Sequence, residues 1–338
     1  MKKLFLSLVA AIVAATATFA QSTLVATLSH GENITMYYGT YALRDAMNAA
    51  QSGDVINLSG GAFQAINITK AVTLRGTGID DANPTYIIND FTINIPETDT
   101  GRLSMEGIRC TGSINFSGVL NNPYFVKSQF NKFTYNYAGP FKNAMFVDCK
   151  ITGSYEMQAS SSSSVQFVNC FVREFENNSA DNCSASFVNC VIWLGDNGGY
   201  QTYRLKSSQL VNSIIFQTYS SDVISKYLPS TTICSNCVAI GYSNIFRDTQ
   251  ASTGCTTATF AEVFKDFTGT YTDEQTFELT ATAKTKYLGT DGTEVGLYGG
   301  ILPYTSTPSY PQITKMNVAN KTTADGKLSV EIEVSAAQ

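Results

Sequence analysis

The chain has 338 residues, 22 of them basic and 27 acidic, and a formal net charge of −5. This length allows one large domain or two, and all-β domains commonly reach it. The acidic balance leaves no basic footprint, which argues against nucleic acid or an anionic membrane as the main partner. Only 14% of the residues are charged, as expected for a chain with many strands and few surface helices.

The first residues are typical of an export signal. Two lysines precede an apolar run from Leu4 to Val13, and small residues end at Ala20. We therefore expect residues 1–20 to be a signal peptide and the mature protein to be exported to the periplasm, the outer surface or the medium. No cysteine follows the run, so a lipid anchor is not expected. No later apolar stretch reaches the roughly 18 residues of a membrane helix.

An amphipathic helix is predicted near residues 41–52, after a strand-like lead-in that contains the only histidine, His30. Thr40 is expected as the N-cap of this helix and Gly53 as its C-terminal stop. The next strands are expected to begin near Gly53 and Val72. The apolar face of the helix would consist of Leu43, Ala46, Met47 and Ala50. Four carboxylates nearby are interpreted as solvated loop charges, namely Asp80, Asp81, Glu97 and Asp99.

A short phrase recurs from Met105 to Ile240 at nearly constant spacing. Clear copies read Phe146-Val-Asp-Cys149, Phe167-Val-Asn-Cys170 and Phe187-Val-Asn-Cys190. Side chains alternate with period two on either side of the third residue, as in two short strands joined at a corner. The corner column, at steps of 20, 21, 21, 20, 23 and 24 residues, is Gly107, Lys127, Asp148, Asn169, Asn189, Asn212 and Asn236.

This repeat predicts an all-β solenoid, a right-handed parallel β-helix with about three strands in each coil. Gly, Asn and Asp tolerate the left-handed backbone that a sharp corner requires, and Lys127 is the odd member of the column. Stacked Asn side chains could also hydrogen-bond along the axis. We interpret the column as scaffold, and the helix near residues 41–52 as the cap over the first coil. Ser160–Ser164 is expected to be a loop at another corner.

The position after the corner is expected to point inward. It carries Cys149, Cys170, Cys190 and Cys237, with Ser128 and Ser213 between them. Cysteines in an exported chain often form disulfides, but a ladder of small buried thiols is favoured here. A Cys170–Cys190 bridge stays open, because neighbouring coils lie about 4.8 Å apart. A metal site at Cys234 and Cys237 is disfavoured, because zinc takes four ligands and no second pair accompanies them.

One outward column suggests a binding surface. Four residues past the corner, an arginine and two aromatic residues fall on neighbouring coils about 4.8 Å apart, and two tyrosines and an arginine follow in the next loop. Aromatic rows flanked by polar groups suit sugar rings. The predicted carbohydrate-binding residues are Arg173, Trp193, Phe216, Tyr200, Tyr203 and Arg204. The alternative is that this face is covered, because the adjacent outward column is also apolar, with Phe171, Val191, Ile214 and Val238.

The repeat dissolves after Ile240. Phe260–Phe267, Phe277–Thr280 and Gly289–Gly300 resemble the closing coils of exported β-helix proteins from Bacteroidetes-type bacteria. We assign residues 21–303 to the β-helix. Two strands, Ile313–Val318 and Lys327–Val334, would form a short C-terminal β appendage over residues 304–338, too short to bury a core alone. The appendage could contact a protein partner at the cell surface.

The opening of the chain resembles the pectin/pectate lyase-like superfamily. The resemblance lies in Leu43-Arg44-Asp45-Ala46 on the helix, the Gly53-Asp-Val-Ile strand and the Val72-Thr-Leu-Arg-Gly76 strand. It covers about residues 39–250 and implies the β-helix fold. The same scaffold hosts lyases, hydrolases, tail spikes and binding proteins, so the resemblance implies no single activity.

Enzymes with this fold carry characteristic catalytic residues, and the expected sets are not found in this sequence. A polygalacturonase-like hydrolase would show an Asp pair and a late Gly-His-Gly segment, whereas His30 precedes the first coil. A calcium-dependent lyase would need stacked Asp ligands, and none accompany Asp148; calcium is expected only if the protein is a lyase, and no other cofactor is expected. A lyase with a Tyr, Lys or Arg base stays open.

We therefore predict a non-catalytic exported protein that binds or organises polysaccharide at the cell surface. The alternative is a divergent polysaccharide lyase or glycoside hydrolase that acts on an acidic or plant-type glycan. An outward cleft with clustered charged groups on successive coils would favour the enzyme. An aromatic row or a covered face would favour the binding protein.

Overall fold

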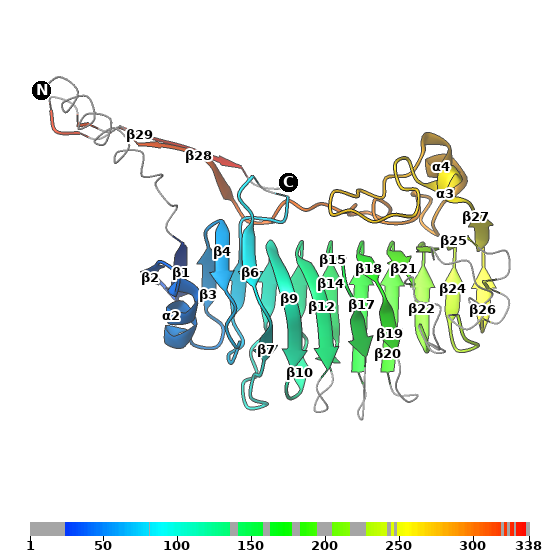
Figure 1. Cartoon of the computed structure of the whole chain (residues 1–338), viewed down its shortest axis with the longest axis horizontal. Coiled ribbons are helices and arrows are strands. Elements are labelled where there is room, and N and C mark those ends of the chain that lie inside the picture. The colour runs from blue at the N-terminus through cyan, green and yellow to red at the C-terminus, as the bar shows by residue number, and fades with distance from the viewer. Residues whose placement is uncertain are drawn as a thin grey trace, which may run out of the picture.

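The chain forms a right-handed parallel β-helix, drawn in Figure 1 with its axis horizontal. The computed structural model describes residues 24–335, except for 81, 136–140, 158–162, 178–182, 195–204, 217–227, 242–244, 247–248, 319–320, 323–324 and 328. The predicted signal peptide lies outside the described residues. None of the helices in the described ranges is long and apolar enough to cross a membrane.

Sheet A forms one of the two long faces of the solenoid. Its strands pair in parallel, except that β1 runs antiparallel to both β2 and β3. In spatial order the strands are β2 (Asn33–Tyr38), β1 (Val25–His30), β3 (Val55–Leu58), β5 (Thr73–Arg75), β8 (Ser104–Glu106), β11 (Tyr124–Val126), β14 (Ala144–Val147), β17 (Ser163–Val168), β20 (Cys183–Val188), β22 (Ser208–Val211), β24 (Ile233–Ser235) and β26 (Ala251–Thr253). Ser163 and Ser164 thus begin β17, so the loop predicted at Ser160–Ser164 is wrong for these two residues.

Sheet B follows sheet A in each coil and is entirely parallel. In chain order its main strands are β4 (Gly61–Gln64), β6 (Thr85–Ile88), β9 (Ile108–Phe116), β12 (Gln129–Tyr135), β15 (Lys150–Ile151), β18 (Phe171–Arg173), β21 (Val191–Trp193), β23 (Ile214–Phe216), β25 (Val238–Ile240) and β27 (Thr256–Ala258). Third strands occur only in some described coils: β7 (Phe91–Ile93), β10 (Leu120–Asn121), β13 (Phe141–Lys142), β16 (Tyr155–Met157) and β19 (Phe175–Asn177). Three strands per coil therefore describes part of the solenoid.

The corner column is confirmed at every position. Its seven residues have positive φ angles, from 47° at Lys127 to 68° at Gly107. Each corner amide hydrogen-bonds to the next coil, as when Asn169 N donates to Val188 O at 3.0 Å. Asn favours this left-handed backbone, because its short polar side chain costs less there than a branched or bulky one.

The interior is built from in-register stacks. Phe125, Phe146, Phe167 and Phe187 are fully buried, with successive ring centroids 4.6, 5.0 and 4.9 Å apart. The inward thiol ladder is confirmed, because Cys149, Cys170, Cys190 and Cys237 are all completely buried and free. Burial raises the pKa of Cys237 to about 12. A buried neutral thiol packs as a small apolar group and is chemically inert.

The predicted cap is helix α2 (Ala42–Ala49), which contacts β1, β2, β3 and β4 at the first coil. Its predicted apolar face is confirmed as buried. The predicted ends are wrong. The chain turns at Gly39, so the N-cap falls on Tyr41, which forms no side-chain cap, and not on Thr40. The helix ends at Ala50 in an extended conformation, and Gly53, with φ of 90°, lies in the turn beyond it.

The segment after β27 does not form closing coils, contrary to the sequence prediction. Helices α3 (Phe260–Val263) and α4 (Ala281–Lys286) and the chain around them pack on the outer face of sheet B. Figure 1 shows the two helices beside β25 and β27, at the end of the solenoid opposite α2. We call residues 259–304 the cover. The chain then returns along the solenoid and ends in the predicted two-stranded appendage, β28 (Gln312–Val318) and β29 (Val330–Ser335), which are antiparallel.

Candidate functional site

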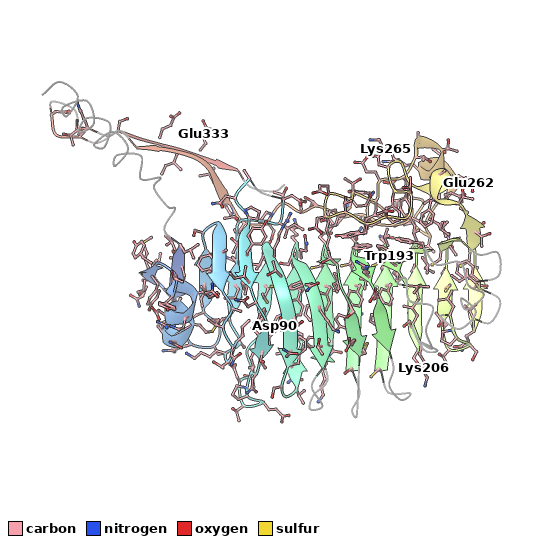
Figure 2. The ribbon with its side chains drawn as sticks, in the orientation of Figure 1. Asp90, Trp193, Lys206, Glu262, Lys265 and Glu333 are labelled. Carbon is pink, nitrogen blue, oxygen red and sulfur yellow. The ribbon has the colours of Figure 1, made fainter. Side chains whose placement is uncertain are left out.

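The predicted aromatic platform is wrong, because the cover lies on it. Trp193 is 3% exposed and Phe216 is fully buried, with ring centroids 5.5 Å apart. Phe267 of the cover packs against both rings, at 6.2 and 5.1 Å. Figure 2 shows Trp193 beneath this layer. The alternative of a covered face is therefore confirmed for the C-terminal half of sheet B.

Arg173 is the predicted site residue that stays accessible in the described part of the chain. Its side chain is 28% exposed and lies at the edge of the cover. The guanidinium carbon sits 4.5 Å from the Trp193 ring centroid, and Nη1 donates to Thr152 O at 3.4 Å. The Glu174 carboxylate lies 3.7 Å from Nε. Tyr200, Tyr203 and Arg204 lie outside the described residues.

A groove begins where the cover ends. It has a cavity volume of about 460 Å³ and lies on the outer face of sheet B, over β6, β9, β12 and β18. The outward column continues into it from Arg173, but with polar residues in place of the aromatic ones. The lining residues are Tyr86, Arg109, Cys110, Thr111, Gln129, Asn131, Thr152, Arg173, Tyr271 and Asp273.

Arg109 lies near the far end of the groove, one coil from Tyr86. Its Nη2 lies 3.3 Å from the Asp80 carboxylate, and Nε donates to the Ile79 carbonyl. Its guanidinium carbon is 5.8 Å from the Tyr86 ring centroid. Asp80 is therefore an ion-pair partner and not merely a solvated loop charge. Asp99 is a second correction, since its carboxylate accepts a hydrogen bond from Ala71 N at 2.9 Å.

The near wall of the groove comes from the cover. The Tyr271 ring stacks on Phe171 at 5.3 Å and an interplanar angle of 6°. Burial and then the negative charge of Asp273 raise the pKa of Tyr271, so the phenol is neutral at physiological pH. Asp273 itself is exposed at the groove rim. The groove thus combines two guanidinium groups, one accessible carboxylate and two tyrosines.

Lys150 lies beside the groove but beneath the cover. It occupies the outward position between Gln129 and Phe171 in sheet B and is 7% exposed. Its Nζ is 5.8 Å from the Tyr304 ring centroid. Burial lowers the pKa of Lys150, opposed by the negative charge of Asp80. Lys150 therefore lies next to the groove with a lowered pKa, but it is not part of the groove lining.

The corner asparagines have a role that sequence reasoning missed. The side chains of Asn169, Asn212 and Asn236 bind the backbone of the later chain that runs past the corners. Asn169 Nδ2 donates to Leu297 O and Gly299 O, at 2.7 and 2.9 Å, and Asn212 Oδ1 accepts from Thr290 N at 2.9 Å. The predicted axial bonding occurs at a different corner, where Asn143 Nδ2 donates to Asn122 Oδ1 at 3.2 Å.

No protein-family model matches the chain, and no curated protein matches it. Within the described ranges, no three His, Cys, Asp or Glu side chains are placed to hold a metal ion.

Of the ten lining residues, sequence reasoning named Arg173 as a site residue. Thr111, Asn131 and Thr152 lie four residues past Gly107, Lys127 and Asp148, so they share the outward column of Arg173. Tyr86, Arg109 and Gln129 could have been found by extending the register of the neighbouring column toward the N-terminus. Tyr271 and Asp273 carry no such signal, because they reach the groove only through the fold of the cover.

Proposed function

We propose that the chain is an exported, non-catalytic β-helix protein that binds polysaccharide in the groove on sheet B. The observation that carries the proposal is the groove itself, an open hollow of about 460 Å³ lined by hydroxyl, amide, guanidinium and phenol groups on successive coils. The export-like opening of the sequence and its resemblance to the pectin/pectate lyase-like superfamily support the same proposal.

The chemistry of the lining suits a sugar chain. Gln129 and Asn131 amides and the Thr152 hydroxyl each donate and accept hydrogen bonds, as sugar hydroxyls do. Arg109 and Arg173, three coils apart, present planar forks that bind carboxylates with two parallel hydrogen bonds. The groove crosses four coil steps of about 4.8 Å, or about 19 Å in all. We therefore propose an extended oligosaccharide with carboxylate groups as the ligand.

A polysaccharide lyase is the second candidate function, and Lys150 is the observation that favours it. A lysine whose pKa is lowered by burial can take a proton from carbon, while a neighbouring guanidinium neutralises the carboxylate next to that carbon. Lys150 is only 7% exposed, however, and its Nζ lies 5.8 Å from the ring centroid of Tyr304 in the cover. The candidate therefore requires the cover to move before reaction.

A binding experiment tests the proposal. The purified protein is run in affinity gels that contain polygalacturonate, alginate or a neutral glucan, and affinities are measured by calorimetry. We expect retardation by at least one acidic polymer, and at least about tenfold weaker binding by Arg173→Gln, since the charge-assisted hydrogen bonds of the guanidinium are lost. Arg44→Gln is the matched control, because Arg44 is 50% exposed on α2 and far from the groove.

Two outcomes would contradict the binding proposal. One is the absence of retardation by every polymer, and the other is equal binding by Arg173→Gln and the wild type. The same samples are monitored for ultraviolet absorbance of unsaturated uronate products. Turnover that is lost in Lys150→Met would replace the non-catalytic proposal with the lyase.

A further inference from the structure

A second hollow lies on the outer face of sheet A, away from the groove on sheet B. It has a cavity volume of about 740 Å³ and extends over the coils from β14 to β26. Its outward residues are stacked by the strand register. Gln166 pairs with Ser186, which pairs with Gln209, which in turn pairs with Ile233. The hollow therefore follows the axis across successive coils.

The chemistry of this surface differs from that of the groove. The described residues that line it include no Lys, Arg, Asp or Glu, and most of their side chains are hydroxyls and primary amides. Such groups donate and accept hydrogen bonds without discriminating by charge. A polyanion or polycation would leave its charges without counter-charges here. A ligand for this surface is therefore uncharged and rich in hydroxyl groups.

The outward side chains are not engaged by the protein itself. Within the part of the chain that the structure describes, Gln166, Ser186 and Gln209 form no side-chain hydrogen bond. Ser164, by contrast, is occupied, since its hydroxyl lies 3.0 Å from Asn143 Oδ1. At the C-terminal end, Ile233 is 38% exposed and offers an apolar surface. Hydroxyl and amide side chains that are free to donate and accept hydrogen bonds, beside an exposed apolar residue, suit the hydroxyl groups of a sugar chain.

We propose that this face of sheet A, centred on Gln166, Ser186 and Gln209, binds an uncharged polysaccharide. The proposal does not depend on the groove on sheet B, because the two surfaces share no residue. A protein with both surfaces would hold an acidic and a neutral chain at the same time. This gives a physical basis for linking two polysaccharides, beyond binding one of them.

The test uses the intact protein and three soluble neutral polymers: a mixed-linkage β-glucan, a galactomannan and dextran. We expect at least one to retard the protein in affinity gels. The double variant Gln166→Ala/Gln209→Ala should bind that polymer about tenfold more weakly or worse, since two hydrogen-bonding groups are lost. Asn48→Ala/Gln51→Ala is the matched control, because it removes two exposed amides at the capping helix.

The variants also separate this proposal from the groove. Arg173→Gln should leave neutral-polymer binding unchanged, whichever way it affects acidic polymers. Failure of all three polymers to retard the protein would overturn the proposal, as would equal binding by the double variant and the wild type. Gln166 and Gln209 are both exposed, so the double variant should fold. Its circular dichroism and melting temperature are measured beside the wild type.

Discussion

The side-chain amide of Asn169 donates a hydrogen bond to the carbonyl oxygen of Leu297, 2.7 Å away and 128 residues later in the chain. The same pattern holds at Asn236, which donates to Leu288 O at 3.1 Å, and at Lys127, which donates to Thr307 O at 2.8 Å. The corners of the solenoid therefore form a row of anchors for the returning chain. That row keeps the cover on the aromatic face and the groove wall in place.

Replacing Asn169 by glycine should weaken this anchoring. Glycine adopts φ of 50° without strain, so the substitution removes the two side-chain hydrogen bonds while keeping the corner. We expect a loss of about 1–3 kcal/mol in the free energy of unfolding, because Gly299 O loses its Asn169 partner and Leu297 O keeps only its bond from Tyr304 N. Chemical denaturation measures it. Asn122→Gly, at an exposed corner with the same φ of 50°, is the control, and a cost as large there would argue against the anchor.

Asp148 is the acidic member of the corner row, and it should make stability depend on pH. Burial raises the pKa of Asp148 from 3.8 to about 7, against the opposing charge of Lys127. The folded state therefore holds the proton more tightly than the unfolded state. This contribution to stability is complete below about pH 4 and is lost as pH rises to about 7.

Asp148→Asn removes this dependence and gives the corner the residue found at the next four. We expect the variant to be more stable than the wild type at pH 8, by about 1–3 kcal/mol, with a smaller difference at pH 5. Thermal or urea unfolding at the two pH values measures the difference. A stability gain of the same size at pH 5 and pH 8 would contradict the raised pKa of Asp148.

The cover can be tested through Trp193, the only tryptophan in the chain. Phe267→Ala removes a ring that is 1% exposed and packs on both Trp193 and Phe216. We expect a red shift of the tryptophan emission and a stability loss of about 3–5 kcal/mol, with the β-sheet circular dichroism retained. Phe260→Ala, which truncates a partly buried ring, should have the smaller effect. An unchanged emission would mean that the cover does not lie on Trp193.

The helix caps offer a matched pair of threonines. Thr259 accepts from Glu262 N in a capping box at α3, whereas Thr40 lies one residue before the N-cap of α2. Thr259→Ala should therefore cost about 1 kcal/mol, and Thr40→Ala less than about 0.5 kcal/mol. Denaturation of the two variants compares the free energies of unfolding. A larger cost at Thr40 would restore the cap that sequence alone predicts.

The solenoid could be predicted because its signal is local and repeated. Asn169 and its aligned residues recur at nearly constant spacing. The left-handed backbone that the corner requires is present even at Lys127. The cover could not be placed in the same way. Its apolar residues lack the repeat, and its contacts with sheet B are set by the path of the whole chain. The apolar outward residues Phe171 and Val191 were the signal that something covers them.

The groove was only partly predictable for the same reason. Arg173 follows from the repeat, but the aromatic residues beside it were assigned to a sugar surface when they form a packed interior layer. Whether an outward aromatic residue meets solvent or a later segment depends on residues far away in sequence. The hydrogen bond from Asn169 to Leu297 O could not be predicted either, because every residue has a backbone carbonyl and the sequence does not show which one lies near Asn169.

The central claim is that the groove between Arg109 and Arg173 binds polysaccharide. Trp193 reports on it directly, because the Arg173 guanidinium lies 4.5 Å from its ring. In a fluorescence titration with acidic oligosaccharides, we predict a saturable change in Trp193 emission. In Arg109→Gln, which alters the groove three coils away from Arg173, the titration curve should shift to about tenfold higher ligand concentration. No change in emission up to high ligand concentration, or identical curves for the two proteins, would contradict the claim.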